Sequence, residues 1–265
     1  MTDVKMTRAR RFEALLGTDF EGRPTRDPED VIYEALDDPR HRERVPGLTA
    51  LLHDPTAHDR ERFLSCVALT TWAEPAGYAA VIEAAREPKL APWYGLLVDR
   101  KFSLDNTFAH LALAVGDSDV LAGDKGTWDQ RTEAFRCLIG IADSEYFDEK
   151  LGDQLDAPTA ATLLSPIRTA VAYGVAALAS HKPLKFDLAT QLVDLAASLA
   201  PVDAAFAVTL ATDVLAQEAH PRALLHAASI VQRSRTAEVR AFAEYLSMSG
   251  DDRVRESVHD ALGLQ

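Results

Sequence analysis

Histidine and aspartate lie next to each other in the stretch Ala50-Leu51-Leu52-His53-Asp54. Imidazole and carboxylate groups together suit a divalent metal ion that activates water for hydrolysis. More residues of these two types could complete such a site, namely His41, His58, Asp59, His110 and Asp117. They are the first candidates for catalytic chemistry in this chain.

The His53-Asp54 pair is similar to the metal-binding helix of HD-domain phosphohydrolases, in which a His-Asp pair binds a divalent metal beside further histidines and an aspartate. The resemblance implies a metal-dependent hydrolase. However, Pro55 follows Asp54 directly, the Ile-Gly continuation of that family is missing, and His41 lies close upstream in an arginine-rich run. A turn-capping aspartate between two repeat helices explains the same residues. We therefore assign no metal ligand and keep His53 and Asp54 as the alternative.

Other motifs of catalysis or cofactor binding do not occur in the sequence. The stretch Gly123-Asp124-Lys125-Gly126-Thr127 has too few residues between its glycines for a phosphate-binding P-loop. The signatures H-E-x-x-H, C-x-x-C, G-x-S-x-G and G-x-G-x-x-G are also missing. We therefore expect no cofactor and favour a protein that is not an enzyme, although a nucleophile assembled from distant residues stays open.

The best binding candidate is the acidic segment 143–156, in which six acids and one lysine surround two aromatic residues. Aromatic side chains supply buried contact area, and acids steer a basic protein partner toward it. The candidate residues are Asp143, Glu145, Tyr146, Phe147, Asp148 and Glu149. A solvated turn between helices, with both rings packed inward, is the alternative.

A second candidate for partner binding is the irregular aromatic segment 93–108, which begins with Trp93 and Tyr94. Prolines and glycines surround it, which favours loops or broken helices. The alternative of inward-packed rings applies here as well.

Regularly spaced prolines indicate the elements that position these residues. Pro166, Pro183, Pro201 and Pro221 are 17, 18 and 20 residues apart, and an apolar run follows each of them. Proline is tolerated in the first turn of a helix but breaks its interior. The spacing therefore predicts successive antiparallel helices, each with one apolar face.

Two segments near the C-terminus resemble helices of HEAT repeats: 236–246 (TAEVRAFAEYL) and 252–262 (DRVRESVHDAL). The resemblance is concentrated in residues 166–262 and implies an all-α fold, an α-solenoid of antiparallel helix pairs of the HEAT or armadillo kind. We expect a single helical-repeat domain over 1–265, with a softer boundary near 150–165 between an irregular acidic part and a regular array. HEAT-like DNA glycosylases suggest nucleic-acid binding as another alternative, with Arg40, Arg42 and Arg44 or Arg233, Arg235 and Arg240 as the basic clusters.

Composition favours a folded acidic protein. Hydrophobic residues make up 47% and charged residues 26% of the 265 residues, and the net charge is −13, which argues against nucleic acid as partner. The first residues contain no apolar run typical of a secretory signal, and no window resembles a membrane span, so we expect neither. Cys66 and Cys137 fit reduced thiols in the cytoplasm.

Together these patterns predict a cytoplasmic protein that recognises a basic protein partner through a helical-repeat surface. One concrete form is an immunity protein that neutralises a basic bacterial toxin, such as a nuclease. The HD-like phosphohydrolase and the nucleic-acid binder are the alternatives.

Overall fold

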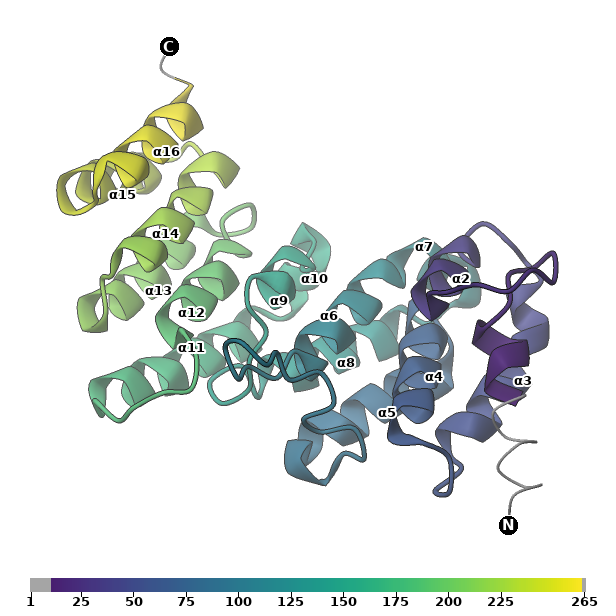
Figure 1. Cartoon of the computed structure of the whole chain (residues 1–265). Helices are drawn as coiled ribbons and strands as arrows, with labels where there is room; N and C mark the ends of the chain where they lie inside the picture. The colour runs from purple at the N-terminus through teal and green to yellow at the C-terminus, as the bar shows by residue number, and fades with distance from the viewer. Residues whose placement is uncertain (1–10, 264–265) are drawn as a thin grey trace. The chain divides into compact units, whose positions relative to one another are not determined.

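A computed structural model describes residues 11–263, and its regular elements are helices (Figure 1). Within this range, β-structure is confined to one isolated antiparallel bridge between Thr18 and Pro24. The predicted all-α class is therefore confirmed. Among the described residues, none of the helices has the length and apolar composition that crossing a bilayer requires. Residues 1–10, on which the expectation of no secretory signal rested, lie outside the described part.

Contacts divide the described chain into two compact units. The first comprises the residues up to Val98 together with Leu113–Phe135, and the second comprises Asp99–Ala112 together with the residues from Arg136 onward. The helices α6 (Thr107–Asp117) and α8 (Trp128–Ile139) each begin in one unit and end in the other. The softer boundary near 150–165 stays a prediction.

The first unit is built around α4, which packs against α2, α3 and α5. Its elements are α2 (Pro28–Glu34), α3 (His41–Leu52), α4 (Asp59–Thr71), α5 (Pro75–Arg86), the 3-10 turn η1 (Pro88–Leu90) and α7 (Asp119–Lys125). The start of helix α2 is fixed locally, because Asp27 accepts a hydrogen bond from the Glu29 amide and Pro28 occupies the first turn.

A partly buried lysine ties three elements of the first unit together. The Lys125 Nζ atom donates to Glu74 Oε1 at 2.5 Å and to the Trp72 carbonyl at 2.7 Å, and lies 3.1 Å from His41 Nε2. Burial lowers the pKa of His41, so its neutral ring accepts from the ammonium while Nδ1 faces the Asp38 carbonyl. This network joins α3, the α4–α5 turn and the end of α7.

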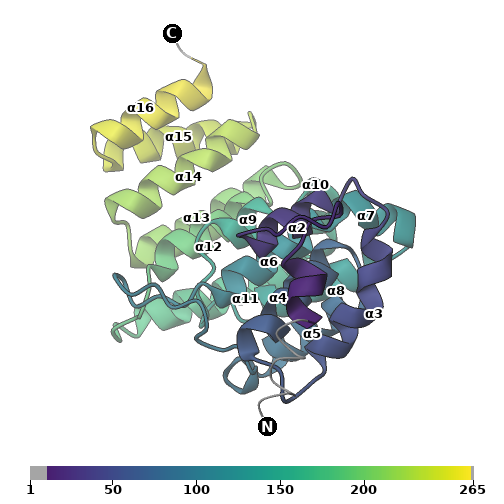
Figure 2. The ribbon, with the colours of Figure 1, turned by 45° about the vertical axis from the view of Figure 1, so that its right-hand side comes forward.

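The second unit contains a stack of helices that follow one another in chain order (Figures 1 and 2). Its elements are α9 (Lys150–Asp153), α10 (Ala157–Thr162), α11 (Leu164–Ala179), α12 (Leu188–Ala197), α13 (Ala204–Gln217), α14 (Pro221–Arg233), α15 (Ala237–Ser249) and α16 (Asp252–Leu262). Helix α13 packs on α11 and α15, and α14 packs on α12 and α16. Sequential pairs contact as well, so α11, α13 and α15 form one row and α12, α14 and α16 form a second row.

Pro166 and Pro221 lie in the first turns of α11 and α14, whereas the other two predicted helices begin later than their prolines. Only Pro221 of the four lies at the first position of its helix. Pro183 and Pro201 lie in turns, and α12 and α13 begin after Asp187 and Asp203. Each of these aspartates caps its helix by accepting a hydrogen bond from the amide three residues on, which fixes the start more strongly than proline does.

Helix α12 is the core of the second unit. All ten of its residues are buried, and its leucines each contribute about 1.5–3 kcal/mol through burial. Two glycines let neighbouring helices approach it. A Cβ atom at Gly174 of α11 would lie 2.3 Å from Leu192 Cδ1, and one at Gly152 of α9 would lie 2.6 Å from the Asp194 carbonyl oxygen.

Candidate functional site

Gln191 of α12 holds the turn that contains the acidic aromatic segment. Its Oε1 atom accepts from the amides of Phe147 and Asp148 at 2.7 and 3.1 Å. Its Nε2 atom donates to the carbonyls of Ala142 and Glu145 at 2.7 and 3.0 Å. One buried side chain thus satisfies four backbone groups of an irregular turn, which otherwise lack helical partners.

The two aromatic rings of this segment have different environments. Phe147 is fully buried, and its ring centroid lies 6.2 Å from that of Phe108. Tyr146 is half-buried against Phe186, and the two ring centroids are 5.6 Å apart. Burial, and to a smaller extent the negative charge of Asp148, raises the pKa of the Tyr146 phenol to about 12. Of the two possibilities left open by the sequence, inward packing holds for Phe147, so that ring is not available to a partner in this structure.

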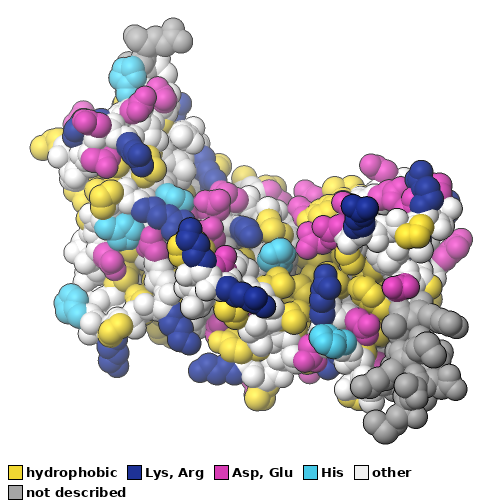
Figure 3. Space-filling view, in the orientation of Figure 1, with side chains coloured by type: hydrophobic (Ala, Val, Ile, Leu, Met, Phe, Trp, Pro, Cys, Tyr) yellow, Lys and Arg dark blue, Asp and Glu magenta, His cyan; other side chains and the backbone are white. Residues whose placement is uncertain are grey.

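Part of the acidity is neutralised within the second unit. Asp148 pairs with Arg222 at 2.8 Å, and Asp153 pairs with Arg233 at 2.9 Å. Figure 3 shows acidic and basic side chains next to each other over α9, α12 and α14. Elsewhere in the predicted segment, Asp143 is half-exposed and Glu149 is exposed.

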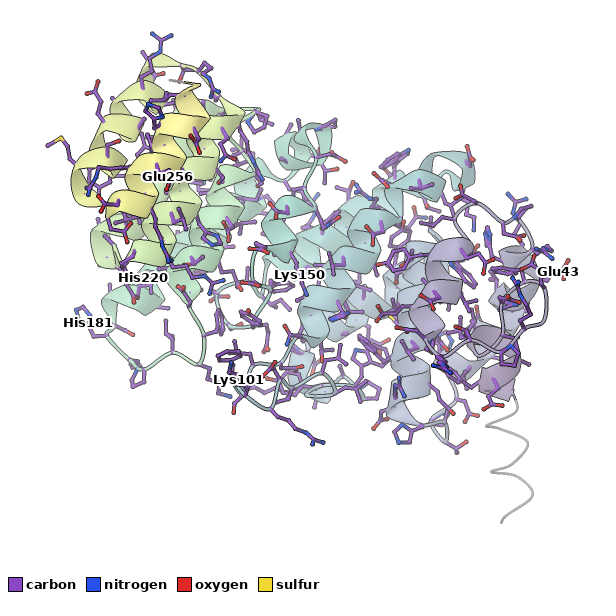
Figure 4. The ribbon with its side chains drawn as sticks, turned by 45° about the horizontal axis from the view of Figure 1, so that its top comes forward. Glu43, Lys101, Lys150, His181, His220 and Glu256 are labelled. Atoms are coloured by element: carbon purple, nitrogen blue, oxygen red, sulfur yellow. The ribbon has the colours of Figure 1, made fainter. Side chains whose placement is uncertain are left out.

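Two histidines of α14 extend this pairing to α12. His226 Nδ1 lies 2.9 Å from Asp194 Oδ1, and His220 Nε2 lies 2.9 Å from Asp187 Oδ1. Figure 4 places His220 at the start of α14. Burial raises the pKa of Asp194 and the contact with His226 lowers it, while the hydrogen bond that His226 donates to Asp194 raises the pKa of His226. We take the ionised pair as the state near neutrality, in which it holds α14 against α12.

The second predicted site, Trp93 and Tyr94, lies in the first unit. Trp93 is only 4% exposed and packs edge-on against Phe63, with ring centroids 6.1 Å apart. Tyr94 is exposed by 37%. Of this pair only Tyr94 therefore presents its ring to the surface.

His53 and Asp54 serve as local caps. His53 ends α3 and its Nδ1 atom lies 2.8 Å from the Thr49 carbonyl, while Asp54 accepts from the amide and hydroxyl of Thr56 at 2.9 and 2.5 Å. His58 caps α4. Within residues 11–263 no three His, Cys, Asp or Glu side chains gather as a group that could hold a metal ion. The turn-capping interpretation of Asp54 thus agrees with its contacts.

The exposed positions of α11 and α13 are poor in charge, whereas α15 exposes the charged residues Glu238, Arg240 and Glu244. Arg168 and Asp213 are the only charged residues among the exposed positions of α11 and α13. In contrast, every exposed position of α16 carries an acidic, basic or histidine side chain. The row also exposes three large side chains: Tyr173 by 63%, Tyr245 by 38% and Met248 by 86%.

Sequence reasoning missed Gln191, Asp194 and the outer face of this row. The spacing of Asp187, Gln191, Asp194 and Ser198 on one side of an otherwise apolar helix was a usable signal that this stripe has polar partners. The sequence could not show which residues these partners are, because they lie more than 30 residues away along the chain.

Comparison with known proteins finds no matching family model, no matching curated protein and no matching solved structure. The function is therefore argued from the geometry alone.

Proposed function

We propose that the protein is a non-catalytic recognition protein whose C-terminal unit is a HEAT-like α-solenoid that binds a protein partner. The observation that carries the proposal is the outer face of α11, α13 and α15, defined by the exposed residues of these three helices. Arg168 and Asp213 are the only exposed charges of α11 and α13, α15 adds Glu238, Arg240 and Glu244, and the three helices expose tyrosine and methionine side chains in a protein of net charge −13.

Protein interfaces have this composition. Charged residues are depleted from their centres, whereas tyrosine and methionine are enriched. Tyr173 and Tyr245 are rigid amphipathic side chains that bury a large area with little loss of rotamer entropy. The row of packed helices supplies an extended rigid support for them.

The partner class that fits this protein is a basic protein. The excess of negative charge accelerates the approach of a basic partner, while the exposed tyrosine and methionine side chains of the face provide the contact. An immunity protein that neutralises a basic toxin is one form of this function. Asp143 and Glu149 serve as steering groups at the surface, because Asp148 is already paired with Arg222.

Affinity purification from source cells with three tagged proteins tests the proposal. Wild type should recover a stoichiometric partner, and a Tyr173→Lys, Tyr245→Lys variant should lose it, because two cations replace the aromatic contact area of the face. A Gln232→Lys variant is the matched control, since Gln232 is exposed on α14 outside that face. Equal recovery by wild type and the double variant would refute the proposed face.

A second pair of substitutions separates steering from contact. Asp143→Lys with Glu149→Lys should slow association and weaken its dependence on salt, while dissociation stays near the wild-type rate. Association rates measured at low and high salt check this outcome, and an unchanged association rate at low salt would remove the acidic segment from the account.

A further inference from the structure

Three large side chains of the first unit are exposed near helix α7. Tyr33 of α2 is exposed by 44%, Val120 of α7 by 57% and Trp128 of α8 by 44%. All three belong to the first unit. The proposed recognition face consists of other residues, so this surface is separate from it.

A hydrogen bond and close packing join these side chains into one surface. The Tyr33 hydroxyl donates to Asp117 Oδ2 at 2.9 Å, which connects α2 to the end of α6. Three residues after Asp117, Val120 lies on the same side of α7 as Gly123, one turn further on. A Cβ atom at Gly123 would lie 3.6 Å from Trp128 Nε1, so the indole packs beside this exposed glycine. We call these five residues the α7 patch.

A buried arginine holds the indole of the α7 patch in place. The Cζ atom of Arg131 lies 5.3 Å from the centroid of the Trp128 ring. Arg131 is 1% exposed, and its Nε and Nη2 atoms donate to the carbonyls of Val115 and Gly116 at 3.0 and 3.1 Å. An exposed ring that is already held in position loses little freedom when a partner covers it. Trp128 therefore suits the role of an anchor in a protein interface.

The charge around the α7 patch is negative. Residues 27–38 contain six acids and no cation. Residues 117–130 contain four aspartates and one cation, Lys125, whose ammonium is bound inward to Glu74. Burial raises the pKa of Asp117, the hydrogen bond from Tyr33 lowers it, and the charge of Asp119 raises it. A partner cation next to these two aspartates is therefore electrostatically favoured.

We propose that the α7 patch docks a basic segment of a protein partner, in which an arginine or lysine lies next to an apolar residue. The apolar residue covers Val120 and Trp128, and the cation pairs with Asp117 and Asp119. An uncharged apolar segment would cover the carboxylates without a counter-charge. Nucleic acid and anionic membranes carry the same sign of charge as the patch. This docking goes beyond the proposed function and holds whether or not the face of α11, α13 and α15 binds a partner.

Titration of the ¹⁵N-labelled full chain with the peptide acetyl-Leu-Arg-Leu-Arg-amide tests the assignment. The protein has three tryptophans and so three indole N–H signals, of which that of Trp128 is identified by its loss in Trp128→Phe. We expect a saturable shift of the Trp128 signal at millimolar peptide. Acetyl-Leu-Gln-Leu-Gln-amide lacks the charge and acetyl-Gly-Arg-Gly-Arg-amide lacks the apolar side chains, so both should bind more weakly.

Substitutions measured by calorimetry do not depend on the folding of the tryptophan variant. Val120→Lys should weaken binding of the leucine-arginine peptide by about tenfold or more, because it removes apolar contact and adds a like charge. Val202→Lys, at an exposed valine of the second unit, is the matched control and should leave binding unchanged. Asp119→Asn should weaken binding by roughly two- to fivefold, and Asp213→Asn, at an exposed position of α13, should not.

Three results would overturn the docking surface or its occupant. An unshifted Trp128 signal at millimolar peptide would remove the surface, and so would equal weakening by Val120→Lys and Val202→Lys. Equal binding of the glutamine peptide would remove the basic occupant. These assays need no captured partner, so their failure is distinguishable from failure of the affinity purification.

Discussion

Replacement of Gln191 by leucine tests the packing of the acidic turn on α12. Leucine has a similar volume but no polar atoms, so the four backbone groups that Gln191 satisfies lose their partner. Two of them, the Phe147 amide and the Ala142 carbonyl, belong to residues with no exposed surface. An unpaired buried polar group costs about 1–3 kcal/mol, and the groups on half-exposed residues regain water.

The sum for the two buried groups is about 2–6 kcal/mol, and the added apolar burial of leucine offsets part of it. We therefore expect a loss of about 2–4 kcal/mol, which is a large share of a typical domain stability. Urea denaturation gives the free energy of unfolding, and hydrogen exchange of the Phe147 amide reports the turn itself. Gln217→Leu, at an exposed position of α13, should change stability by less than about 0.5 kcal/mol.

A loss below about 1 kcal/mol for Gln191→Leu, or unchanged exchange protection at Phe147, would refute this reasoning. Either result would mean that the turn is held by its burial rather than by the glutamine.

Three further substitutions or conditions test other parts of the structure. Gly152→Ala should lower stability by about 1–3 kcal/mol, because its Cβ atom would lie 2.6 Å from the Asp194 carbonyl oxygen; a higher Tm would show that the close approach is not rigid. Lys125→Met should cost about 2–3 kcal/mol in urea denaturation, since it strands the carboxylate of Glu74, of which only 19% of the side chain is exposed; a neutral effect would contradict the proposed role of that ion pair. Because Asp194 raises the pKa of His226 above 6.5, the contribution of this histidine to stability is fully present below pH 6.5 while Asp194 stays ionised, and it is lost as the pH rises through the folded-state pKa of His226. His226→Gln should therefore flatten the decline in stability between neutral and alkaline pH, and an identical pH profile in wild type and variant would contradict the pairing.

The helical class and the positions of turns were predictable because they depend on local chemistry. The Asp27-Pro28 start of α2 and the Pro221 start of α14 agree with the structure, since a cap and a proline act within one turn of chain. The starts of α12 and α13 were placed too early, because Pro183 and Pro201 belong to the turns and the aspartate caps decide where a helix begins.

The candidate site was less predictable because its contacts join distant parts of the sequence. Composition alone cannot show that Asp148 meets Arg222, 74 residues later, or that Phe147 turns inward. The charge-poor outer face arises from which side of α11 and α13 packs inward, and that side is fixed only once the two rows of helices are assembled. The solenoid geometry and the partner-binding role remain predictions.

Oxidative footprinting of the protein with and without its captured partner tests the central claim most directly. Tyr173, Tyr245 and Met248 are exposed and reactive, so the recognition account predicts that all three are oxidised more slowly in the complex. Phe102, which is 63% exposed outside the proposed face, should be oxidised at the same rate in both samples. Unchanged oxidation of Tyr173, Tyr245 and Met248 in a stoichiometric complex would contradict recognition through the row of α11, α13 and α15.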